Sequence, residues 1–110
     1  MPAFHWIYTT WPDAQSAGTA ARRLVADGLC ACANILPGMT SVYVWDGNPQ
    51  EDQETVMILK ADGAQTDALR TRFVELHPYE TPCFVVLDID ETHSHRGYLD
   101  WLKVSSRQPL

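Results

Sequence analysis

Two apolar stretches near the middle of the chain, VYVW at residues 42–45 and VMIL at residues 56–59, constrain the fold most strongly. Both are rich in β-branched and aromatic residues, which favours strands. Successive side chains of a strand point to opposite faces, so each strand would be apolar on both faces. Such strands indicate burial on both sides. Two helices can cover only one face of a small sheet, and we therefore expect another subunit to cover the second face.

Apolar periodicity and turn residues predict the order β-α-β-β-α-β, followed by a short helix. Pro37-Gly38 predicts a bulge or bend, residues 46–52 predict a longer hairpin loop, and Pro78 predicts that the second helix ends at His77. This order is the split βαβ of a ferredoxin-like α+β sandwich, and we expect one domain over residues 1–110. The expected strands span residues 4–11, 31–45, 54–61 and 82–90, and the expected helices span residues 12–28, 64–77 and 98–102.

Charge and composition make several partners unexpected. The formal net charge is −6, and the eight Lys and Arg are spread along the chain. Nucleic acids and anionic membranes usually bind a basic face, so neither is an expected partner. No segment approaches the ~20 apolar residues of a membrane span, and the first residues lack the basic region and long apolar run of a signal peptide. We therefore expect a cytoplasmic protein with reduced thiols.

The sequence HPYE, residues 77–80, has two interpretations. In the structural one, His77 ends a helix, Tyr79 packs, and Glu80 is solvated. In the functional one, an imidazole, a phenol and a carboxylate line one pocket. Lys60 and Glu54 share one strand face and pose the same choice, since Lys60 either ends a strand in solvent or contacts a ligand.

Three further features bear on metals and catalysis. Cys30 and Cys32 would lie on one strand face, and small buried Cys as core residues is the favoured interpretation over half of a metal site. His93 and His95 lie in a polar loop and are the candidate metal ligands, because imidazoles bind Cu(II) well. No phosphate loop, zinc-protease motif or strained nucleophile turn is present, so no enzymatic activity is predicted.

The motifs together resemble the CutA family of divalent-cation tolerance proteins. The stretch CACANILPGMTSVYVWDG (residues 30–47), the spaced Glu54 and Lys60, HPYETP (77–82) and YLDW (98–101) occur in the family's order. The resemblance covers the chain from Thr9 to Trp101. It implies a ferredoxin-like fold, a homotrimer built through the long hairpins, similarity to PII signalling proteins, and a role in tolerance of copper and other divalent cations.

The resemblance also implies a site and shows two departures. Some members carry a thiol where this chain has Thr9, a poor ligand for soft copper, and a carboxylate where it has Cys83. We expect Glu80 to pair with Lys60 beside His77 at a subunit boundary. The residues expected in the intersubunit cleft are Cys32, Glu54, Lys60, His77, Tyr79, Glu80 and Trp101.

Two functions follow from the sequence. The first is a trimeric, cytoplasmic CutA-like protein that supports divalent-cation tolerance by weak metal binding or by regulation. The second is a PII-like sensor that binds a small anionic metabolite in the intersubunit cleft, with Lys60 and His77 as cationic contacts. No cofactor is firmly implied, and the candidate ions are copper and other divalent cations. An acid–base enzyme using His77, Tyr79 or Glu80 is a third hypothesis without an identified reaction.

Overall fold

The computed structural model describes residues 3–106 of the chain, and it confirms the predicted ferredoxin-like α+β fold. The first and last few residues of the expected 1–110 domain lie outside this range. The last helix is longer than the sequence predicted, and the fourth strand is shorter. In chain order the elements are β1 (Phe4–Trp11), α1 (Ala14–Ala26), β2 (Cys32–Trp45), β3 (Asn48–Asp62), the short 3-10 helix η1 (Gly63–Gln65), α2 (Thr66–Leu76), β4 (Phe84–Asp88) and α3 (Arg96–Ser105).

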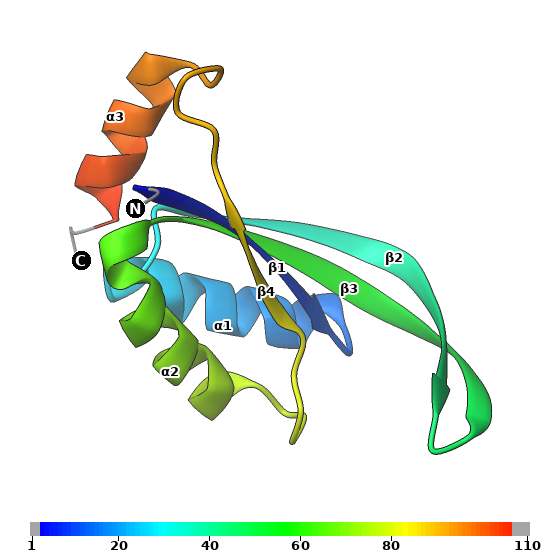
Figure 1. Cartoon of the computed structure of the whole chain (residues 1–110). Helices are drawn as coiled ribbons and strands as arrows, with labels where there is room; N and C mark the ends of the chain where they lie inside the picture. The colour runs from blue at the N-terminus through cyan, green and yellow to red at the C-terminus, as the bar shows by residue number, and fades with distance from the viewer. Residues whose placement is uncertain (1–2, 107–110) are drawn as a thin grey trace.

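The four strands form one antiparallel sheet in the order β2-β3-β1-β4. Helices α1 and α2 lie together on one face of this sheet, and α3 lies at the end opposite the hairpin tip (Figure 1). The main core forms between the sheet and α1 and α2, and includes Ile7, Leu24, Met57 and Phe73, all fully buried. In the part of the chain that the structure describes, the opposite face carries no helix over most of its area, and we call it the open face of the sheet.

Local signals explain where the helices begin and end. The Asp13 side chain accepts a hydrogen bond from the Ser16 amide at 2.7 Å, which caps the free N–H groups at the start of α1. Helix α2 ends at Leu76 because Pro78 disfavours helical geometry at the preceding His77, as predicted. The imidazole of His95 caps α3 by accepting a hydrogen bond from the Tyr98 amide, so α3 begins before the residue that the sequence suggested.

The predicted long loop at residues 46–52 is wrong. The hairpin turns through Asp46 and Gly47, which have φ of 54° and 77°, and Trp45 pairs with Asn48 directly beyond them. Two consecutive residues at positive φ are the signature of the tight Asp-Gly turn, which suits the twist of a hairpin. The polar residues 48–53 are therefore part of β3. Proline is unusual in a strand because it lacks a backbone donor, but Pro49 pairs with Val44 on β2 beyond the end of β1, where β3 has one neighbouring strand.

The predicted bulge at Pro37-Gly38 is confirmed. The β2–β3 register shifts between Leu36 and Met39, and Gly38 has a φ of 84°, which few other residues adopt. Beyond the bulge, residues 39–45 of β2 pair with residues 48–54 of β3 and form a hairpin arm that projects past α1 and α2 (Figure 1). We call these two segments the arm.

The arm is apolar but uncovered in the single chain. Val42 is 75% exposed, Val44 68% and Trp45 61%, whereas Met57 and Leu59 at the base of β3 are fully buried under the helices. Leu36, Val85 and Leu87 are also exposed, and their register places them on the open face of the sheet. Within residues 3–106, the two strands are thus covered on one face at their base and on neither face in the arm.

Candidate functional site

A groove with a volume of about 1020 Å³ lies where the arm, the end of β1 and the corner between α2 and β4 converge. It contains three of the predicted site residues, Glu54, Tyr79 and Glu80. A smaller cavity of about 410 Å³ between α1 and the end of α2 contains none of them. The groove is lined by Tyr8, Thr10, Met39, Thr40, Ser41, Val42, Tyr43, Trp45, Asp52, Glu54, Pro78, Tyr79, Glu80, Thr81 and Cys83.

The groove is acidic. Asp52, Glu54 and Glu80 contribute carboxylates, and none of the described residues that line it is Lys or Arg. The hydroxyl of Tyr43 donates a hydrogen bond to Asp52 Oδ2 across the hairpin. This hydrogen bond is the main reason that the pKa of Tyr43 is raised to about 12.

Tyr43 and Asp52 were missed as site residues because residues 46–52 were read as a loop. The sequence did carry a signal that could have found them. Reading Asp46-Gly47 as a tight turn pairs Ser41 with Asp52 and Tyr43 with Gln50, which places Tyr43 and Asp52 diagonally on one face of the arm.

The corner at residues 77–81 is tied to the end of β1 through His77. The Nε2 atom of His77 lies 2.8 Å from the carbonyl oxygen of Thr10, and its Nδ1 accepts a hydrogen bond of 3.0 Å from the Tyr79 amide. Burial lowers the pKa of His77 below its ordinary value of 6.5, against the hydrogen bond to Thr10 and the charge of Glu54, which both raise it. His77 is the residue that ends α2, and its imidazole lies behind the groove wall, bonded to β1 and to the corner.

Tyr79 and Cys83 complete the wall of the groove beside Glu54. Burial is the first cause that raises the pKa of Tyr79, followed by the negative charges of Glu54 and Asp52 and a hydrogen bond with Glu54. Burial also raises the pKa of the Cys83 thiol, so thiolate formation is disfavoured there. Cys83 stands where some relatives are expected to carry a carboxylate, and it makes this side of the groove less acidic.

Lys60 does not lie beside the HPYE corner within one chain, so the expected contact with Glu80 is not formed there. Lys60 pairs with Trp6 near the start of β1, whereas His77 binds Thr10 near its end, four residues or ~13 Å along the strand. The prediction placed the end of β3 at the wrong level, because β3 runs antiparallel to β1 and its end returns to the start of β1.

Lys60 instead belongs to a second group of predicted site residues near α3. Its Nζ atom lies 3.4 Å from the Tyr98 hydroxyl and 5.5 Å from the centre of the Tyr98 ring. The Tyr98 ring lies 5.5 Å from the ring of Trp101, and Cys32 is the register partner of Lys60 on β2. The predicted set is therefore divided between an acidic groove and this cationic–aromatic group.

Cys30 and Cys32 do not share a face, contrary to the expectation for a continuous strand. β2 begins at Cys32, and the chain bends just before it, so Cys30 turns into the core under α1 and α2. Burial raises the pKa of the Cys30 thiol to about 12, which makes it unreactive. The interpretation of Cys30 as a core residue is confirmed, while Cys32 is only half-buried.

Thr9, at the position where some relatives are expected to carry a thiol, is a buried structural residue. Its hydroxyl donates a hydrogen bond of 2.7 Å to the Met57 carbonyl and accepts one of 3.0 Å from Trp11 Nε1. The side chain is fully buried. Thr9 therefore cannot reach a metal in the groove.

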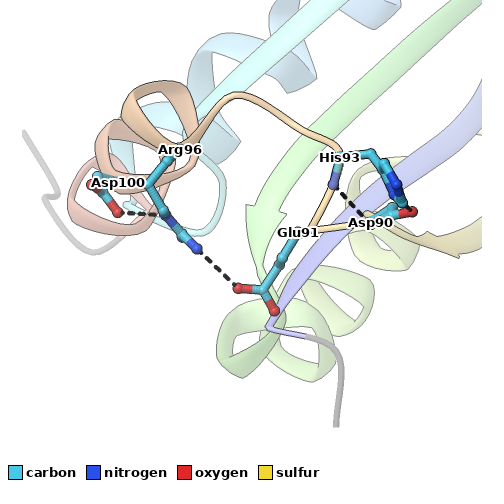
Figure 2. A network of polar contacts seen from close by, with 5 residues as sticks. All are labelled: Asp90, Glu91, His93, Arg96 and Asp100. Atoms are coloured by element: carbon cyan, nitrogen blue, oxygen red, sulfur yellow. Dashed lines mark hydrogen bonds and ion pairs between the residues drawn. The ribbon is translucent and has the colours of Figure 1, made fainter.

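The two candidate metal ligands have different surroundings. His93 points at Asp90, and its Nδ1 lies 2.9 Å from Asp90 Oδ2, while Arg96 bridges Glu91 and Asp100 nearby (Figure 2). His95 uses its Nδ1 to cap α3. Within residues 3–106, no three His, Cys, Asp or Glu side chains converge to hold a metal ion.

The fold and the groove define a ferredoxin-like α+β protein with a projecting hairpin arm, and comparison with known proteins places it in a family. Residues 5–105 match the model of the CutA1 divalent ion tolerance protein family. The chain is similar to the divalent-cation tolerance protein CutA of Thermus thermophilus, with 42% identity over 97 residues, 88% of this chain and 92% of that protein. The chain belongs to the CutA1 divalent ion tolerance protein family.

Two solved structures support this assignment. The PII-like protein CutA from Nostoc sp., in its apo form, has a TM-score of 0.87 and 33% identity, covering 94% of this chain and 97% of that one. The periplasmic divalent cation tolerance protein CutA from Archaeoglobus fulgidus has a TM-score of 0.88 and 30% identity, covering 94% and 99%. Within the described part of this chain, none of the helices is long and apolar enough to cross a membrane.

Proposed function

We propose that this protein is a cytoplasmic homotrimer without enzymatic activity that supports divalent-cation tolerance, by weak metal binding or by regulation. The observation that carries the proposal is the uncovered apolar surface of the arm and the open sheet face. Exposed apolar surface of this kind marks an interaction site in a protein of this size. The three free cysteines fit the reducing cytoplasm.

The two long edges of the arm offer backbone hydrogen-bonding groups as well as apolar contact. Among residues 3–106, β2 is an edge strand over its whole length, and residues 48–54 of β3 pair with no strand on the side away from β2, because β1 ends at the pair of Trp11 and Thr55. Long edges with apolar side chains tend to pair with another chain. A second copy that adds a strand here would cover the arm and complete its backbone hydrogen bonds.

The association is tested by sedimentation velocity at micromolar concentration. We expect a species of about 37 kDa, three times the 12.4 kDa chain. Val44→Asp puts a charge on the arm and should shift the protein toward lower mass. Thr71→Asp is the matched control, because Thr71 is exposed on α2, away from the arm. A wild-type monomer of about 12.4 kDa would contradict the proposal.

Metal binding is proposed to be weak and to involve His93 and His95. Imidazole nitrogens bind Cu(II) well, and Asp90 beside His93 adds a carboxylate. Because three ligands do not converge in residues 3–106, a tight preformed centre is not expected in one chain.

Calorimetric titration with Cu(II) should show weak binding that the double variant His93→Ala, His95→Ala reduces further. Thr92→Ala with Ser94→Ala is the control in the same loop. Sub-micromolar affinity that survives in the histidine double variant would place the metal elsewhere.

The second candidate, a PII-like sensor for a small anionic metabolite, gains support from the PII-like description of the Nostoc relative. The charge of the groove within one chain opposes it, because Asp52, Glu54 and Glu80 repel an anion and Lys60 lies at the other end of β1. A thermal-shift panel of small anions decides the matter, since a ligand of the folded state raises the melting temperature. A shift that Lys60→Met abolishes would favour the sensor.

A further inference from the structure

His77 occupies an unusual position, because both of its ring nitrogens are hydrogen-bonded to backbone groups from different segments. Nε2 contacts the Thr10 carbonyl of β1 at 2.8 Å, and Nδ1 contacts the Tyr79 amide of the corner at 3.0 Å. The Thr10 carbonyl lies just beyond Thr9 and Phe84, the last residue pair between β1 and β4. The imidazole therefore connects the end of the sheet to the corner that forms the groove wall.

These two partners fix the protonation state of the ring. A carbonyl oxygen can only accept, so Nε2 must carry a proton. A backbone amide can only donate, so Nδ1 must be unprotonated. Both hydrogen bonds can exist together only in the neutral tautomer with the proton on Nε2.

The surroundings favour this neutral ring. His77 is 7% exposed, and its ring lies 4.2 Å from Trp11, 5.2 Å from Phe73 and 4.8 Å from Tyr79, measured between ring centres. A buried charge is costly in such an apolar site.

The charged and titratable groups around the ring come from few elements. Glu54 of β3 is the carboxylate that favours the charged ring, while burial opposes it more strongly. β1 and α2 contribute the rings of Trp11 and Phe73, and the corner contributes the phenol of Tyr79, on which Asp52 and Asp13 also act. Glu80 of the corner and Cys83, the residue before β4, are further titratable groups of this wall.

We propose that His77 is a proton-operated latch on the acidic groove. In its neutral form it holds residues 78–81 against the end of β1, with Tyr79 and Glu80 on the groove wall. A proton on Nδ1 places two N–H donors face to face at the Tyr79 amide, so this hydrogen bond is lost. Residues 78–81 are exposed, so little burial opposes their release. The groove wall then loosens as the pH falls.

The latch is tested in the whole protein by NMR, with ring ¹⁵N shifts of His77 and amide hydrogen exchange of Tyr79 followed from pH 7.5 to 5. We expect an Nε2-protonated neutral ring at the upper pH. As the ring titrates, the protection factor of the Tyr79 amide should fall about tenfold, which corresponds to loss of one hydrogen bond. The Leu29 amide, which bonds to the Leu24 carbonyl at the end of α1, is the internal reference and should keep its protection.

Two variants separate the latch from general acid effects. His77→Gln keeps one donor and one acceptor without a titrating ring, so protection at Tyr79 should become independent of pH. His93→Gln removes an exposed imidazole from another loop and should behave as wild type. If His77→Gln does not fold, the wild-type ring shifts and Tyr79 protection decide alone. A neutral ring protonated on Nδ1, or Tyr79 protection that stays constant while His77 titrates, would overturn the latch.

Discussion

The base of the β2–β3 hairpin and its arm have similar strand-forming sequences but differ in how much of their apolar surface is buried. At the base, Met57 and Leu59 are fully buried because α1 and α2 lie over them. In the arm, Val42 and Val44 are 75% and 68% exposed because none of the helices within residues 3–106 lies over them. The local sequence therefore determines that both regions are strands, while coverage by other elements determines which of them belongs to the core.

The largest effect on the free energy of unfolding should come from a tryptophan that is buried under α1 and α2. Trp11→Ala removes a fully buried ring that packs against Phe73 and His77, and should lower the free energy of unfolding by about 3–5 kcal/mol. Trp45→Ala, on the arm, is the matched control. When unfolding is measured by chemical denaturation at concentrations where the protein is dissociated, Trp45→Ala should change the free energy of unfolding only slightly. Equal losses in the two variants would break the contrast between base and arm.

A hydroxyl in the same buried region should have the next largest effect. Thr9→Val conserves shape but removes the acceptor of Trp11 Nε1 and the donor to the Met57 carbonyl. Leaving a buried donor unsatisfied costs about 1–3 kcal/mol, which urea denaturation can measure. Thr40→Val, which is exposed on the arm, should change little. If Thr9→Val leaves the free energy of unfolding unchanged, the two hydrogen bonds of the Thr9 hydroxyl add nothing to the stability of the base.

The turn of the arm should show a smaller effect. Gly47 has a φ of 77°, so Gly47→Ala should destabilise the hairpin by about 1 kcal/mol. Gly47→Asn is the control, because Asn tolerates positive φ better than Ala. NMR shifts of the arm report the change. If both variants leave the arm unchanged, the tight turn is not what sets its register.

The smallest effect should be a dependence on pH. Burial lowers the pKa of His77 in the folded chain below the value of 6.5 expected when unfolded. Between these two pKa values the unfolded state binds more protons, so stability decreases as pH falls below about 6.5. His77→Gln should flatten this part of the pH profile of the melting temperature, whereas His93→Gln should leave it in place. A profile of the same slope in both variants would assign the dependence to other groups.

The sequence predicted the architecture well because its strongest signals are local. Pro78 ends α2, Pro37-Gly38 produces the bulge, and the stretches rich in β-branched and aromatic residues form the strands. The prediction of a long loop at residues 46–52 was wrong, because Pro49 and its polar neighbours favour a loop and the signal of the tight Asp-Gly turn is only two residues long.

The candidate site was predicted less completely, because its members come from separate elements. Glu54, Tyr79 and Glu80 line one groove of the single chain, whereas Lys60 lies at the other end of β1 and not at the level that the sequence predicted. Its position depends on the direction of β3 relative to β1, which no short motif encodes. Tyr43 and Asp52 could be paired only once the register of the arm was known.

The tight turn at Asp46-Gly47 has no spare residues, so the arm can change in length only when both of its strands gain or lose the same number of residues. Adding one residue to each strand would extend the arm by ~3.3 Å and would also exchange the sides on which the terminal side chains stand. Adding two to each strand would restore the original sides. An arm of this design can therefore be lengthened or shortened between relatives by residue pairs on both strands together, while a single-residue insertion in one strand forces a new bulge.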